Sequence, residues 1–194
     1  YPTVDENRFR PSLPSDDLRA AIGVTAGQKL ILSVGRLMRR KGFDSVIRAL
    51  RLLRQQGIDA HYAVIGIGED RDYLQGLAVE LGLTERVHLL GHVSYEDLPR
   101  WYCASDLFAM PNRDIGGDTE GFGLVYLEAA GAGRPVVAGT AGGTGSAVVD
   151  GVTGLRVDGE QVDAVAQALA RLLRNAEEAA QMGRNGRARV LENY

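Results

Sequence analysis

Two glutamates, Glu120 and Glu128, stand eight residues apart on either side of the glycine-rich sequence GFGLVYL. Eight residues of helix rise roughly 12 Å, whereas the two carboxyl groups of a retaining glycosidase stand about 5 Å apart. The spacing therefore favours a long ligand that is held at two points. Because Glu128 lies among apolar residues, its carboxylate needs hydrogen-bond donors. The hydroxyl groups of a ribose would supply them.

The residues between the two acids suit a phosphate. Gly121 and Gly123 remove side chains from the start of the predicted helix, so the backbone N–H groups there are free to face an anion. The helix dipole stabilises a negative charge at this position by about 0.3 to 1 kcal/mol. Taken singly, each glutamate is better explained structurally: Glu120 as an acid at a helix start, and Glu128 as the partner of a basic side chain such as Arg134.

A second segment adds cations and favours the functional interpretation. A buried run ends at Gly35, Arg36 follows directly, and Lys41 comes five residues later at the mouth of the next helix. Both side chains can reach one diphosphate: the guanidinium of Arg36 can donate two parallel hydrogen bonds, and the ammonium of Lys41 is a compact positive charge. Each such bond contributes about 1.5 to 3 kcal/mol. The neighbouring arginines are interpreted as a solvated basic surface: Arg39, Arg40, Arg48, Arg51 and Arg54.

These residues must be positioned by alternating strands and helices, and the alternation predicts an α/β, doubly wound parallel sheet of the Rossmann-like kind. Strands are predicted near 29–34, 60–66, 86–90, 106–110, 135–139 and 153–157. Helices are predicted near 16–21, 43–56, 69–81, 95–104, 121–132, 145–150, 161–173 and 175–194. Residues 1–28 hold three prolines and are predicted to form a linker and a short lead-in helix, with one domain over 29–194.

The chain resembles the C-terminal, donor-binding domain of the two-domain retaining glycosyltransferases of family 4 (GT-B fold, glycosyltransferase group 1). The pair Glu120 and Glu128, with Arg36 and Lys41 before it, is the specific part of the resemblance. Weaker matches cover nearly the whole chain: Val4-Asp5, Phe9-Arg10-Pro11, Gly35-Arg36-Leu37, Lys41-Gly42, Gly66-Ile67-Gly68, Gly91-His92-Val93, Ala104-Ser105-Asp106, Gly133-Arg134-Pro135-Val136-Val137, Gly142-Gly143 and Asp150-Gly151-Val152-Thr153-Gly154.

The resemblance implies roles for individual positions. Glu120 would face the donor sugar and Glu128 would take the ribose hydroxyls, while Arg36 and Lys41 would neutralise the diphosphate beside Gly35. The backbone near Val93 would meet the nucleobase. The amides that would meet the sugar and diphosphate are those of Gly121, Phe122, Gly123 and Leu124. The reaction implied is hexosyl transfer from a nucleotide sugar with retention of configuration, with no metal and no other cofactor.

Three departures and one likeness refine this expectation. The family's usual G-G-x-P-E motif reads Gly142-Gly143-Thr144-Gly145-Ser146 here, so no glutamate role transfers to that loop, and Thr3 stands where Gly is usual. The loop 111–120 is long and glycine-rich, which predicts mobility until a ligand binds. A long loop of this kind before E-G-F-G-L-V-Y-L-E is similar to that of the phosphatidylinositol mannosyltransferases, which implies GDP-mannose as the donor.

Composition excludes several functions. The chain has 194 residues, of which 45% are hydrophobic, enough for one sizeable core. A net charge of −3 gives no reason to expect nucleic-acid binding. The single cysteine, Cys103, excludes an internal disulfide, fits a reducing cytoplasm and is interpreted as a packing residue. No apolar run is long enough to span a bilayer and no signal peptide opens the chain, so any membrane contact would be peripheral, at the inner face.

Length predicts a missing partner domain. A complete enzyme of this kind would carry an N-terminal acceptor domain before Tyr1, so the chain is interpreted as an excised donor half that binds GDP- or UDP-sugars with little turnover. The alternative is a nucleotide-sugar-binding module, or an epimerase relative, of the same architecture.

Other motifs are interpreted structurally. Asp70-Arg71-Asp72 sits at a helix start, where acids are expected. His88 and His92 are interpreted as lone histidines because their segment reads as a strand, and Trp101 and Tyr102 as core residues on a helix capped by Ser94.

Overall fold

The computed structural model describes residues 3–194 and contains one six-stranded parallel sheet with the order β3-β2-β1-β4-β5-β6. Tyr1 and Pro2 of the predicted linker lie outside the described residues. The doubly wound α/β prediction is confirmed. The strands are β1 Lys29–Val34, β2 Ala60–Ile65, β3 Val87–Gly91, β4 Leu107–Met110, β5 Val136–Gly139 and β6 Gly154–Val157.

The helices agree with the predicted ranges except at two places. They are α1 Asp16–Ala21, α2 Phe43–Gln55, α3 Arg71–Glu80, α4 Asp97–Ala104, α5 Leu124–Gly131, α6 Val162–Arg174 and α7 Ala176–Asn193, with 3-10 helices η1 Arg39–Lys41 and η2 Gly142–Ser146. The helix predicted near 121–132 begins later because Gly123 adopts a left-handed conformation, with φ of 79°.

The helix predicted near 145–150 is wrong. In its place the chain forms η2, which begins earlier, and a bridge between Asp150 and Gly154 follows. A Cβ atom on Gly142 would lie 2.1 Å from the carbonyl oxygen of Glu120, and one on Gly143 would lie 1.9 Å from that of Gly121. The glycine-rich stretch is therefore held against the Glu120 loop instead of winding into an α-helix.

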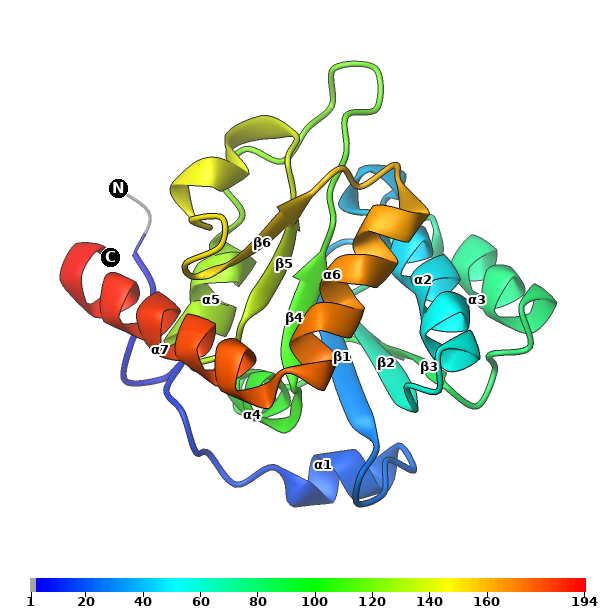
Figure 1. Ribbon diagram of the computed structural model, residues 1–194, viewed down its shortest axis with the longest axis horizontal. Helices are drawn as coiled ribbons and strands as arrows, with labels where there is room; N and C mark the ends of the chain where they lie inside the picture. The colour runs from blue at the N-terminus through cyan, green and yellow to red at the C-terminus, as the bar shows by residue number, and fades with distance from the viewer. Residues whose placement is uncertain (1–2) are drawn as a thin grey trace.

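The sheet reverses its strand order at β1, whose neighbours are β2 and β4. Right-handed crossovers then place α2 and α3 on one face of the sheet and α4 and α5 on the other (Figure 1). The four inner strands are largely buried, as expected for a parallel sheet covered on both faces, and the edge strands β3 and β6 are partly buried. In α/β proteins ligands bind beyond the carboxyl ends of the strands at such a switch point, so the loops after β1 and β4 are the ones to inspect.

The expected packing residues are confirmed. Trp101 and Tyr102 are buried, and the side chain of Ser94 accepts a hydrogen bond from the backbone N–H of Asp97 at 3.0 Å, at the start of α4. Cys103 is a buried free thiol whose sulfur lies 3.2 Å from the carbonyl oxygen of Arg10. Among residues 3–194, no helix is long and apolar enough to cross a membrane.

The prediction of lone histidines is wrong for His88. Its ring stacks on that of His61, with the centroids 5.3 Å apart, and Nε2 of His88 lies 2.9 Å from Nδ1 of His61. Arg86 Nη1 lies 2.8 Å from Nε2 of His61. Because a guanidinium only donates, Nε2 of His61 accepts and its Nδ1–H donates to His88. His92, directly after β3, is exposed.

The buried ring of His61 predicts acid sensitivity. Burial, with the charge of Arg86 as a smaller cause, lowers the pKa of His61 from 6.5 to about 4. The unfolded chain therefore takes up a proton more readily, so stability is full above about pH 6.5 and falls as the pH drops towards 4. We expect a loss of about 2 to 3 kcal/mol from this group by pH 4, measured by urea unfolding. His61→Gln should flatten this part of the profile, and His92→Gln should leave it unchanged.

Candidate functional site

The loops after β1 and β4 pack closely together at the carboxyl edge of the sheet. A Cβ atom on Gly42, which has φ of 76°, would lie 2.1 Å from the carbonyl oxygen of Pro111. A Cβ atom on Gly35 would lie 3.8 Å from both Cε of Lys41 and Sδ of Met110. The two sequence segments that carry the predicted cations and acids are therefore brought into contact.

Glu120 and Lys41 are joined in an ion pair. Oε2 of Glu120 contacts Nζ of Lys41 and lies 3.0 Å from Nη1 of Arg40. The three side chains are only 12 to 17% exposed, so the attraction is less screened by water than at the surface. The site thus holds one carboxylate between two cations.

The interpretation of Arg40 as solvated surface is wrong. Arg40 bonds Glu120, and its Nε lies 3.1 Å from Oδ1 of Asp118. The reason is local: η1 turns its residues tightly, and the left-handed Gly42 directs the chain into α2. Five arginines crowd this stretch and nothing in the sequence marks Arg40 among them, so only the turn geometry distinguishes it.

Arg36 is placed differently from Lys41. Its side chain is 70% exposed, and its nearest acid is Glu69, with the guanidinium 3.9 Å from the carboxylate. The structure therefore does not bring Arg36 into the Lys41 and Glu120 cluster. Such a distant, exposed pair is weak, which leaves Arg36 free to turn towards a ligand. Arg39 instead pairs with Asp70 at 3.2 Å, at the start of α3.

The glycine-rich start of α5 leaves amides unoccupied. Between residues 3 and 194, no hydrogen-bond acceptor faces the N–H groups of residues 121–125; the first one bonded is that of Tyr126, to the carbonyl of Gly123. A side chain on Gly121 would meet nothing within 4 Å, so the backbone there is open to an incoming group. The predicted amides of Gly121, Phe122, Gly123 and Leu124 are thus available. The ring of Phe122 packs beside Tyr194, with the centroids 5.9 Å apart.

Glu128 is held by a tyrosine and not by Arg134. Its Oε2 accepts a hydrogen bond of 2.7 Å from the hydroxyl of Tyr102. Burial raises the pKa of the Glu128 carboxyl, while the Tyr102 hydroxyl and the charge of Arg8 oppose the rise. No partner within the described residues engages its Oε1. Sequence reasoning missed Arg8 and Tyr102 as neighbours of Glu128, since Tyr102 read only as core.

Val93 lines a groove near the carboxyl end of β3, and its contact with a nucleobase stays a prediction. The groove has a volume of about 220 Å³. It is lined by Val34, Gly35, Ile65, Gly66, Ile67, Gly91, His92, Val93 and Leu98. Its floor depends on glycine, because a Cβ atom on Gly66 would lie 1.9 Å from the carbonyl oxygen of Gly35. The groove thus shares Gly35 with the loop that carries Arg36 and Lys41.

The long loop after β4 is anchored at its base. Nη2 of Arg113 donates to Oδ2 of Asp44 at 2.9 Å, and Nη1 donates to Oγ of Ser45 at 2.9 Å. The backbone N–H of Arg113 donates to the carbonyl of Arg40 at 2.8 Å. The remainder of the loop projects as a narrow hairpin beyond the sheet, bridged between Ile115 and Asp118 (Figure 1). Mobility of that tip stays a prediction.

Removing the anchor should destabilise the protein. Arg113→Ala would leave Asp44, which is 9% exposed, as a buried charge without a counter-ion in residues 3–194, held only by the hydroxyl of Tyr73, and we expect a loss of about 3 kcal/mol in urea unfolding. Adding Asp44→Asn should restore part of that loss. Arg48→Ala, at an exposed position on α2, the helix that carries Asp44, is the control and should change stability by no more than about 0.5 kcal/mol. Equal effects of the two arginine variants would contradict the anchor.

Comparison with known proteins agrees with this geometry. A mannosyltransferase of Mycolicibacterium smegmatis, named as GDP-mannose-dependent alpha-(1-6)-phosphatidylinositol monomannoside mannosyltransferase, is 41% identical over 100% of this chain and 51% of its own length. A Corynebacterium glutamicum relative, named as acting on the monoacylated form, is 40% identical over 96% of this chain and 49% of its own length. The chain spans about half the length of these curated relatives.

Solved structures show the same architecture. Anabaena Alr3699/HepE, crystallised with UDP and glucose, is 29% identical with a TM-score of 0.88 over 100% of this chain and 52% of its own. The C-terminal domain of a Francisella tularensis glycosyl transferase group 1 family protein is 26% identical, with a TM-score of 0.83 over 98% of both chains.

The family model described as glycosyl transferases group 1 matches residues 14–189, nearly the whole chain. That range includes every predicted site residue, the two paired loops and the groove. The chain therefore belongs to the glycosyl transferases group 1 family.

Proposed function

We propose that this chain is the donor-binding half of a retaining hexosyltransferase that takes mannose from GDP-mannose. The observation that carries the proposal is the ion-pair cluster of Lys41, Arg40 and Glu120, placed beside the open amides of residues 121–125 at the switch point of the sheet. The printed GDP-mannose dependence of relatives about 40% identical to this chain supports the choice of donor. The UDP complex of the Anabaena protein supports nucleotide binding.

The charges suit the departure of a nucleoside diphosphate. As the bond to the sugar breaks, negative charge grows on the diphosphate, and preorganised cations and amides stabilise it. Lys41 and the amides of residues 121–125 would receive the phosphates, and Arg36 would swing in from its exposed position. These groups neutralise the leaving diphosphate without a metal ion, which is why we propose metal-independent transfer.

The remaining groups would bind the other parts of the donor. Glu128 would bind the ribose through Oε1, the groove at Val93 would bind the base, and Glu120 would face the sugar. The acceptor would bind to an N-terminal domain outside this chain. The whole enzyme would be cytoplasmic, and any contact with the membrane would be peripheral. The chain alone would then bind the donor with little turnover.

Titration calorimetry with GDP and UDP in the presence of a chelator tests the proposal. We expect GDP to bind without divalent ions and more tightly than UDP. Absence of heat with either nucleotide, on folded protein, would overturn nucleotide binding. Equal or tighter binding of UDP would overturn the choice of donor. Binding without transfer once an N-terminal half is present would favour a binding module of the same architecture.

A variant of Arg36 tests the cationic part of the site. Arg36→Gln should weaken GDP binding about 10-fold, the equivalent of one charge-assisted bond of about 1.5 kcal/mol. The thermal midpoint should not move, because Arg36 is exposed and weakly paired. Arg51→Gln, at an exposed position on α2, is the matched control. An unchanged GDP affinity in Arg36→Gln would remove this residue from the site.

A further inference from the structure

A second cavity opens at the amino edge of the sheet, opposite the donor site. It has a volume of about 560 Å³, within the range of about 300 to 1,000 Å³ typical of small-molecule sites. Lys29 begins β1, Asp106 directly precedes β4 and Pro135 directly precedes β5, and all three line it. We call it the amino-edge pocket, and none of the predicted donor residues belongs to it.

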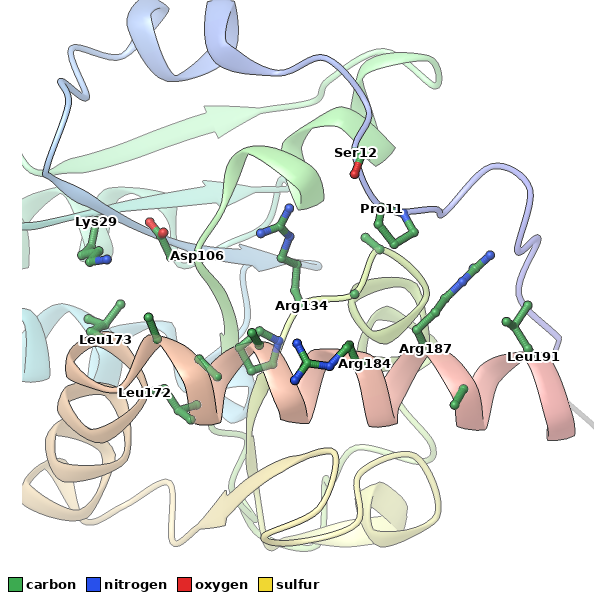
Figure 2. Close-up of a pocket in the computed structure, with 17 residues that line it drawn as sticks. Pro11, Ser12, Lys29, Asp106, Arg134, Leu172, Leu173, Arg184, Arg187 and Leu191 are labelled. Atoms are coloured by element: carbon green, nitrogen blue, oxygen red, sulfur yellow. The ribbon is translucent and has the colours of Figure 1, made fainter.

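Its walls are mostly apolar. Leu172 and Leu173 of α6 close one end, and α7 runs along one side with Leu191 towards its other end (Figure 2). Small side chains on α7 leave room for a ligand between that helix and the loop before β5. The lining alanines are Ala176, Ala179, Ala180 and Ala188 of α7, together with Ala132 directly after α5.

Positive charge surrounds this apolar cavity without matching acids. Arg134, from the loop before β5, and Arg184, from α7, both line it, and Lys29 lies near its Leu173 end (Figure 2). Within residues 3–194, none of these three cations forms an ion pair, although Nη2 of Arg184 donates to Oε1 of Gln181 at 2.5 Å. Nε of Arg134 is buried without a hydrogen-bond partner in the same range. The lining acid, Asp106, is already bonded to Arg19 and to the backbone N–H of Leu30.

Arg187 differs from the other cations. Its Nη1 donates to the carbonyls of Glu6, Phe9 and Gly131 at 2.9 to 3.1 Å. It therefore ties the N-terminal segment to α5 and α7, and its role is structural. The charge available to a ligand comes from Lys29, Arg134 and Arg184.

We propose that the amino-edge pocket binds an anionic single-chain amphiphile, such as an alkyl phosphate. The alanine- and leucine-lined cavity takes the chain, and the cations without a counter-ion in residues 3–194 take the head group, since Nε of Arg134 is buried without a partner there and an anionic acceptor would satisfy it. A second copy of this chain fits less well, because a two-fold contact across this face would set arginines against arginines.

Calorimetry with dodecyl phosphate, below its micelle concentration, tests the proposal on this chain. We expect saturable binding of one molecule, with inorganic phosphate and dodecyl maltoside each binding at least about tenfold more weakly. The first comparison removes the tail and the second removes the charge. GDP affinity, measured in the same samples, should stay unchanged, which separates this site from the donor site.

Two variants locate the binding. Arg134→Gln with Arg184→Gln should weaken dodecyl phosphate binding at least about tenfold, whereas Arg48→Gln with Arg51→Gln, which removes the same charge from the exposed face of α2, should not. Ala180→Trp should block the pocket from an exposed position without disturbing the core, and Ala20→Trp, exposed on α1, is its control.

Several results would overturn the proposal. These are no binding of dodecyl phosphate, equal binding of dodecyl maltoside, equal binding of inorganic phosphate, or unchanged binding in Ala180→Trp. A dimer by light scattering that dissociates in Ala180→Trp would assign the pocket to a second copy instead.

Discussion

Replacing Glu120 by glutamine in the full-length enzyme is expected to lower sugar transfer from GDP-mannose at least about 100-fold, the size of effect seen when one group that stabilises a transition state is removed. GDP affinity should change less than about threefold, because Glu120 contacts the cations and not the nucleotide in our assignment. The structure adds a reason for this separation. Without the carboxylate, Lys41 and Arg40 lose their shared partner and become more available to the diphosphate.

The measurement is initial-rate transfer beside calorimetry on the same preparation. Glu80→Gln is the matched control, since Glu80 is an exposed acid at the end of α3 and outside the predicted site, and it should leave transfer within about twofold, as expected of a surface substitution. If Glu120→Gln reduced GDP affinity and transfer by the same factor, the residue would serve binding alone. A variant with full activity would remove Glu120 from the chemistry.

Glu128→Gln is expected to weaken GDP binding about 10- to 100-fold, because a charge-assisted hydrogen bond to the ribose becomes a neutral one in a largely buried place. The fold should survive, since glutamine is isosteric and still accepts from the Tyr102 hydroxyl. Calorimetry with GDP checks the affinity and a thermal midpoint checks the fold. Unchanged affinity would exclude Glu128 from the ribose site.

The pH dependence of GDP binding gives an independent test of Glu128. Burial raises the pKa of its carboxyl above the ordinary value of 4.5, so the carboxylate is lost as the pH falls through that raised pKa. Affinity should therefore be full at neutral pH and decline in mildly acidic solution. Tyr102→Phe removes a hydrogen bond that opposes the rise, which should move the decline to higher pH. Glu128→Gln should show no such step.

The fold could be predicted from the sequence because the signals are local. The strands have apolar runs that a parallel sheet buries on both faces, and the helices have an apolar stripe with polar residues around it. The exception, the helix predicted near 145–150, failed for a non-local reason. Gly142 and Gly143 have to fit against the backbone of Glu120 and Gly121, which are more than 20 residues away in the sequence.

The sequence predicts which residues form the candidate site, and that membership stays a prediction; the contacts among them could not be predicted. The position after a buried strand marked Arg36 and Lys41, and the spacing of the acids marked Glu120 and Glu128. The tertiary fold decided which charges meet: Glu120 joins Lys41 and Arg40, Arg36 stays exposed, and Glu128 lies against Tyr102. No spacing rule links β1 to a loop some 80 residues later.

By itself, the sequence determined the doubly wound sheet and the residue types at the edge where the site is predicted, because hydrophobic period and turn chemistry act over a few residues. Only the tertiary structure decided the ion-pair partners, the anchoring of the long loop by Arg113 and Asp44, and the cationic pocket at the opposite edge. These depend on contacts between distant segments, whose geometry is set when the sheet assembles and its crossovers pack.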